Sequence, residues 1–122
     1  MFTLLYTYMN QNITERTFNF AVRISKYQFY LKEKKNYEIA SQVFRSWTSI
    51  WANISEAQSS SSKKDFIHKM NIALKEAKET TFRLKLLEQW FDESNEDIQK
   101  ECEEVTKILV TIIKNTKNNM KK

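Results

Sequence analysis

Residues 45–80 read RSWTSIWANISEAQSSSSKKDFIHKMNIALKEAKET, and they contain two helix ends and the turn between them. One amphipathic helix closes before the four serines of 59–62. A second helix opens after them with a capping signal, because Ser62 stands three residues before Asp65. A short connection makes neighbouring helices antiparallel. The stretch therefore predicts a helical hairpin, with the serine run as its turn rather than a linker between domains.

The composition extends this prediction to the whole chain. Its 122 residues include no glycine and no proline, and 29% of them are charged. Strands and hairpins need turn residues between alternating apolar runs, and such signals are absent. A chain of this length forms one domain with a small core. An all-α single domain over residues 1–122 is therefore expected.

Apolar residues spaced alternately by three and four place four helices, at about 13–32, 37–58, 62–90 and 95–116. Asn12 with Glu15, and Asn36, are the expected caps of the first two. The predicted fold is an antiparallel up-down-up-down four-helix bundle, with 1–12 as an irregular extension and 117–122 as a basic tail. The predicted inward positions are Phe20, Ile24, Tyr27, Leu31, Ala40, Val43, Trp47, Ile50, Ile54, Ala57, Phe66, Met70, Ala73, Ala77, Thr80, Leu84, Leu87, Phe91, Ile98, Cys102, Val105, Leu109, Ile112 and Thr116.

Three of these helices carry apolar residues beyond one seam. A second stripe belongs either to a wide contact inside the bundle or to a contact with a partner chain. Both interpretations stay open on the residues alone. The positions concerned are Phe18, Val22, Phe29, Ile67, Leu74, Ile108 and Ile113.

The N-terminal MFTLLYTYM is apolar but is neither a signal peptide nor a membrane span. It lacks a positive first region and a small-residue cleavage site, and it is too short to cross a bilayer. Met9 is a second candidate start. The lone Cys102 permits no internal disulfide, which fits a reducing compartment. A cytoplasmic protein is therefore expected.

Residues that could carry catalysis are sparse. His68 is the only histidine, and its simplest role is a hydrogen bond with Asp65. Glu76 and Glu79 stand among lysines, as exposed ion pairs do. Alternatively, they face inward with Arg45 and form a buried polar network. No catalytic residue, metal ligand or cofactor is predicted, and no enzyme is expected.

Charge is segregated along the chain. Residues 1–64 have a net charge of +5, whereas residues 92–104 have a net charge of −6. A cationic region of this kind suits phosphate binding, although lysines beside a turn can equally be a solvated helix end. Few aromatic residues stand out as exposed stacking platforms, which favours structured or duplex nucleic acid over single strands. The candidate nucleic-acid-binding residues are Arg16, Arg23, Lys26, Arg45, Lys63 and Lys64.

The quoted stretch resembles a family of small four-helix-bundle proteins first noticed in intervening sequences of bacterial 23S ribosomal RNA genes. The family pattern reads R-S-G-T-S-I-G-A-N-I-x-E-A, a turn, then S-k-k-D-F-i-x-K-m-x-I-A-l-K-E-a-x-E-T. The resemblance implies a homopentamer and an association with RNA or DNA. One branch of the family works beside a reverse transcriptase as the accessory subunit of diversity-generating retroelements. The resemblance marks as structural motif residues Ser46, Asn53, Glu56, Asp65, Glu76 and Glu79.

Trp47 and Trp51 depart from that pattern, because both stand where the family has glycine. Trp90 stands at a helix end, where a C-terminal glycine is expected. One hypothesis is that the gene comes from a lineage that reads UGA as glycine. All three tryptophans would then result from translating UGA as tryptophan. The other is a genuine indole pair that fills a wider groove. The codons at positions 47, 51 and 90 distinguish the two.

Two functions therefore follow from the sequence. The first is a non-enzymatic, homo-oligomeric adapter that binds nucleic acid and presents it to an enzyme such as a reverse transcriptase. The second is a structural oligomer that acts through protein contacts, with an incidental basic surface.

Overall fold

The computed structural model describes residues 2–34, 37–91 and 95–120, and for residues 2–11, 90 and 91 it describes the backbone alone. Four helices make up these residues, and no strand occurs among them. They are α1 (Phe2–Glu33), α2 (Tyr37–Ala57), α3 (Lys63–Phe91) and α4 (Glu96–Met120). The prediction of an all-α fold with four helices is confirmed.

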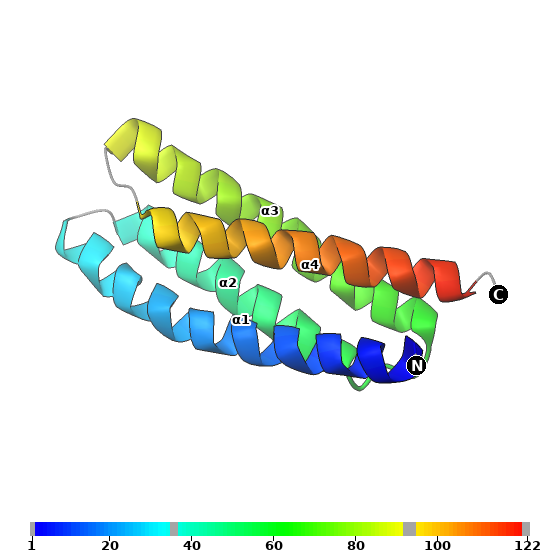
Figure 1. The fold of residues 1–122 in the computed structure, drawn as a ribbon. Helices are drawn as coiled ribbons and strands as arrows, with labels where there is room; N and C mark the ends of the chain where they lie inside the picture. The colour runs from blue at the N-terminus through cyan, green and yellow to red at the C-terminus, as the bar shows by residue number, and fades with distance from the viewer. Residues whose placement is uncertain (1, 35–36, 92–94, 121–122) are drawn as a thin grey trace.

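Contacts between the helices show that chain neighbours run in opposite directions. Phe20 of α1 meets Trp47 of α2, with ring centroids 4.4 Å apart, whereas the earlier Phe18 meets the later Trp51 at 5.9 Å. Contacts between α3 and α4 follow the same rule, and Figure 1 shows the chain running along the bundle and back twice. Because α1 also contacts α4, each helix packs against two others.

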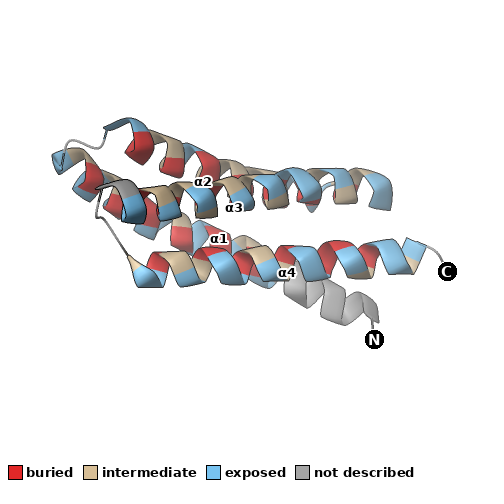
Figure 2. Ribbon diagram, turned by 90° about the horizontal axis from the view of Figure 1, so that it is seen from above, coloured by how far each residue is buried: buried red, intermediate tan, exposed pale blue. Residues whose placement is uncertain are grey.

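The core consists of the inward positions that the spacing predicts. Every one of them except Phe91, whose side chain lies outside the description, is buried. Figure 2 shows buried residues of α4 on the side that faces the other helices. The core also contains small side chains, because Ala40, Ala73 and Ala77 are each 0% exposed. The alternation of three and four places these residues on one face of each helix, which is the reason the prediction succeeds.

Helix α1 begins at Phe2, so the prediction of an irregular extension over 1–12 is wrong. Asn12 lies inside the helix instead of capping it. No glycine or proline interrupts the segment, and extending an existing helix adds one hydrogen bond per residue. Likewise α4 continues to Met120 through much of the expected tail, with Lys117 in its last turn near the negative end of the dipole. Asn36 lies outside the described residues.

The starts of α3 and α4 are both capped, and the cap of α3 is the one that the sequence predicts. The Asp65 backbone N–H donates to Ser62 Oγ at 3.0 Å, which satisfies one of the donors left free at a helix start. At α4 the Ile98 N–H donates to Asn95 Oδ1 at 3.1 Å. Glu96 and Asp97 lie in the first turn of α4, where negative charge stabilises the helix dipole.

The second apolar stripes divide between the core and the surface. Ile113 is buried, and Ile67, Leu74 and Ile108 are half-buried against the core. These residues therefore belong to a wide contact inside the bundle. The stripe on α1 is different, because Phe18 is 53%, Val22 48% and Phe29 69% exposed. None of the described helices is long and apolar enough to cross a membrane.

Trp47 is a core residue of the α1–α2 contact. Its side chain is 0% exposed, and its indole Nε1–H donates to the backbone carbonyl of Thr17 at 3.0 Å. The ring packs edge-on against Phe20. Trp51 is half-buried against Phe18, and the side chain of Trp90 lies outside the description. A buried, hydrogen-bonded indole favours the interpretation that the residue at position 47 is a genuine tryptophan.

Cys102 is buried between α3 and α4. The Cys102 thiol lies 3.1 Å from Thr81 Oγ and donates to the Ala77 carbonyl at 3.5 Å. Burial raises the pKa of Cys102 from its ordinary 9.0 to about 11, although the hydrogen bond between Cys102 and Thr81 acts in the opposite direction. The thiol is therefore protonated at neutral pH and acts as a small core residue.

Candidate nucleic-acid-binding surface

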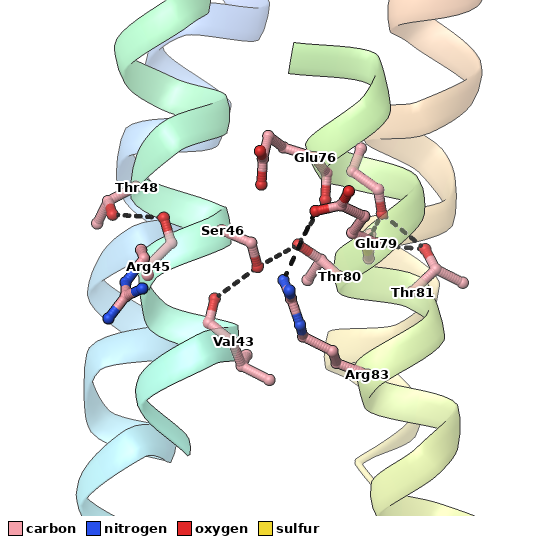
Figure 3. Close-up of polar contacts among 11 residues, drawn as sticks. Val43, Arg45, Ser46, Thr48, Glu76, Glu79, Thr80, Thr81 and Arg83 are labelled. Carbon is pink, nitrogen blue, oxygen red and sulfur yellow. Dashed lines mark hydrogen bonds and ion pairs between the residues drawn. The ribbon is translucent and has the colours of Figure 1, made fainter. Parts of the chain in front are cut away.

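A pair of hydroxyls joins α2 to α3 in the part of the chain that carries the family pattern (Figure 3). Ser46 Oγ and Thr80 Oγ lie 2.7 Å apart, and both residues are buried. Ser46 Oγ also lies 3.2 Å from the carbonyl of Val43, and Thr80 Oγ lies 2.8 Å from that of Glu76. Both hydroxyls therefore have partners inside the bundle, and the bond between them fixes how α2 and α3 align.

The carboxylates of Glu76 and Glu79 lie at the edge of this contact. Arg83 pairs with Glu79 at 3.9 Å within α3. Burial raises the pKa of Glu76, and the negative charge of Glu79 raises it further. Arg45 is exposed and points away from α3 in Figure 3, so the alternative of a buried network between Arg45 and these carboxylates is wrong. Adjacent residues of a helix point about 100° apart, so Arg45 turns outward where Ser46 turns inward.

The remaining motif residues act within their own helices. Asn53 donates to the Ser49 backbone carbonyl at 2.9 Å, and Glu56 is exposed. The Asp65 carboxylate pairs with Lys69 at 3.9 Å, which leaves the expected Asp65–His68 hydrogen bond without support. His68 itself is exposed. These contacts therefore stay within single helices, whereas the Ser46–Thr80 pair joins α2 to α3.

Arg16 differs from the other candidate cations, because it pairs with a carboxylate of α4. Its Nε donates to Glu101 Oε2 at 2.7 Å, and its Nη2 donates to Glu101 Oε1 at 2.5 Å. The hydrogen bond to Glu101 raises the pKa of Arg16. The two side chains are 33% and 18% exposed. The guanidinium of Arg16 therefore joins α1 to α4 through the Glu101 carboxylate and is not free to bind phosphate.

The other five candidates are exposed and fall into separate places. Arg23 and Lys26 lie on the outer side of α1, and the guanidinium of Arg23 lies 5.0 Å from the centroid of the Phe20 ring. Lys63 and Lys64 begin α3, where the positive end of the helix dipole adds to their charge. Arg45 lies on α2. The structure therefore brings together Arg23 with Lys26 and Lys63 with Lys64, but not all six residues.

Exposed aromatic residues are the feature that the sequence interpretation missed. Phe29 is 69%, Tyr37 60% and Tyr30 43% exposed, and Phe82 on α3 is 65% exposed. A signal was present, because residues 18, 22 and 29 lie opposite the predicted inward seam of the first helix. Side chains opposite the buried seam of a helix face the solvent, so the same position that indicated a second apolar stripe also indicated exposed aromatic rings.

We expect the ion pair of Arg16 to contribute to stability rather than to ligand affinity. Arg16→Glu places like charges together and should lower the free energy of unfolding by about 1–2 kcal/mol. The double exchange Arg16→Glu with Glu101→Arg should restore most of that loss, whereas Arg23→Glu should change it by less than about 0.5 kcal/mol. Urea denaturation followed by circular dichroism measures these differences. A stable Arg16→Glu variant with weakened RNA binding would instead make Arg16 a phosphate ligand.

Comparison with known proteins places this surface in context. A family model described as 23S rRNA-intervening sequence protein matches residues 9–111. A crystal structure of a protein with unknown function from the S23 ribosomal protein family, from Bacteroides thetaiotaomicron, is 41% identical to this chain, with a TM-score of 0.81. That match covers 87% of this chain and 98% of the other. No match was found among curated proteins.

Proposed function

The chain belongs to the 23S rRNA-intervening sequence protein family, and from this premise we propose that it is a non-enzymatic homo-oligomeric adapter that binds nucleic acid. One observation carries the proposal. The segment of α1 between Arg16 and Lys32 contains no aspartate or glutamate, and its cations Arg23 and Lys26 are exposed. Arg23 and Lys26 form no ion pair among the described residues, unlike Arg16, so they are available to phosphate, and their binding releases counterions from the nucleic acid.

Self-association would increase the positive electrostatic field of such a surface. The outward face of α3 carries a shallow groove of about 470 Å³ with apolar side chains and both signs of charge. Exposed apolar side chains next to charged ones also occur at interfaces between protein chains. In a closed ring, the same cationic patch repeats around one axis and its field increases. The groove is lined by Asn71, Leu74, Lys75, Lys78, Glu79 and Phe82.

An adapter role also fits the chemistry of the side chains. The single thiol is buried and protonated, and the single histidine is exposed. We therefore propose that the protein presents RNA or DNA to an enzyme on another chain, as the accessory subunit of a retroelement does for its reverse transcriptase.

Charge reversal away from the bundle core tests the proposal. Arg23→Glu with Lys26→Glu, and separately Lys63→Glu with Lys64→Glu, should weaken binding to RNA and DNA at low salt, and each should lower the slope of the salt dependence by about 1 for each phosphate that is no longer neutralised. Lys114→Glu with Lys117→Glu is the matched control, because it makes the same change in net charge on exposed residues of α4. Fluorescence anisotropy with labelled RNA and DNA over a salt series measures both effects.

Two outcomes would contradict the adapter. The first is an affinity no higher than that of an unrelated protein of similar charge. The second is a loss of affinity in the control that equals the loss in the other double variants, which would show that only net charge matters. The structural oligomer that acts through protein contacts would then be the better interpretation.

A further inference from the structure

We infer that the solvent face of α1 is a stacking platform for single-stranded nucleic acid. The inference rests on the proposed function and names its ligand class and its site. The platform comprises Phe18, Arg23, Lys26, Phe29 and Tyr30. It reverses the expectation of duplex binding, which depended on a lack of exposed aromatic residues.

All five platform residues are exposed. The helical period turns Phe18, Lys26 and Phe29 away from the buried seam, whereas Arg23 and Tyr30 lie at one edge of this face and contact Phe20 and Tyr27. The opposite side holds the buried Phe20, Ile24, Tyr27 and Leu31. Phe18 and Phe29 are eleven residues apart, which corresponds to about 16 Å along a helix. The platform is therefore an elongated surface with rings at both ends, with Lys26 between them and Arg23 at one edge.

Contacts with neighbouring side chains hold several platform groups in place. The Tyr30 ring stacks on Tyr27 with centroids 6.0 Å apart and an interplanar angle of 14°. Lys34 Nζ lies 5.3 Å from the centroid of the Tyr30 ring, and Phe18 leans on Trp51. Rings that are already ordered lose less conformational entropy when a base stacks on them.

The charge of this face favours a nucleic acid over a second copy of the chain. No carboxylate lies between Arg16 and Lys32, and Glu15 and Glu33 lie just beyond that span. Two copies placed face to face along it would bring like charges together. A phosphate backbone is complementary to the cations, and its bases are complementary to the rings.

The rings select a single strand over a duplex. Aromatic side chains bind bases by stacking on their faces, which is possible for any base that is not already stacked inside a helix. A duplex can offer this face of α1 only its phosphates. The platform should therefore give affinity for single strands with little dependence on sequence.

Conservative substitutions separate stacking from simple apolar contact. Phe18→Leu with Phe29→Leu keeps the face apolar but removes both rings. Its affinity for labelled oligothymidylate of about 16 nucleotides should fall about tenfold for each ring removed, while affinity for a duplex of equal length should not change. Phe29→Trp should keep the single-strand affinity. Phe29→Leu alone is the second variant, because Phe18 also contacts Trp51.

The outcomes distinguish the platform from the adapter role. If Lys63→Glu with Lys64→Glu weakens binding but the leucine variants bind single strands normally, the platform is wrong and the proposed function stands. If the leucine variants fall in molecular mass by light scattering and keep their affinity, the face is an interface between copies and the platform is also wrong. An equal loss of affinity for single strand and duplex would likewise overturn it. A loss for single strands alone, at unchanged mass, supports it.

Discussion

Trp47→Gly should destabilise the bundle by about 4–6 kcal/mol, because truncating a buried tryptophan to alanine costs about 3–5 and glycine in a helix interior about 1 more. The substitution removes the indole packed on Phe20 and leaves the carbonyl of Thr17 without its donor. Small domains have a total stability of about 5–15 kcal/mol, so the variant should be close to unfolding at room temperature. Urea denaturation of the purified variant measures the loss.

Trp51→Gly is the matched control for that experiment. Trp51 is half-buried and contacts Phe18 at the edge of the same seam, so its removal should cost clearly less. If Trp47→Gly instead equals or exceeds the original in stability, then glycine suits this position better and the recoding of UGA gains support. The codons give an independent answer, because UGG at position 47 excludes recoding there.

Light scattering coupled to size exclusion should give a mass that is a multiple of 14.7 kDa, and five copies are expected from the family resemblance. Phe82→Glu should reduce the mass to that of one chain, because it would place a carboxylate in the apolar part of the groove on α3, where burying an unpaired charge costs several kcal/mol. Val110→Glu on α4 is the control, since Val110 is 45% exposed and lies outside the groove. A single chain at micromolar concentration in the unsubstituted protein would contradict self-association.

The bundle could be predicted from the sequence because the patterns that identify its helices and turns lie between residues close together in the chain. Spacings of three and four identify which face of each helix is buried, and the serine turn before Asp65 fixes where α3 begins. The start of α1 could not be read in this way, since Asn12 and Glu15 form a convincing capping pair at a place where the helix simply continues. A capping sequence can mark the start of a helix, but it does not interrupt a helix that has already begun at an earlier residue.

The surface was harder to predict than the core, because it depends on which helices meet. Arg16 and Glu101 are 85 residues apart, and only the packing of α1 on α4 brings them together. Sequence identified Arg16 as one cation among several and could not show that its charge is used inside the protein. The exposed rings of α1 were visible as apolar residues, but their role depends on the cations that share their face.

The burial of Cys102 has a consequence for the motions of the bundle. It is the only thiol in the chain, and a reagent can reach it only when α3 and α4 separate. Its labelling rate therefore reports the free energy of that opening. The raised pKa couples this opening to pH: the stabilisation from keeping the thiol neutral is complete below pH 9.0 and is lost as the pH rises towards about 11. Labelling over a denaturant series would thus separate local opening of these two helices from global unfolding in the unmodified protein.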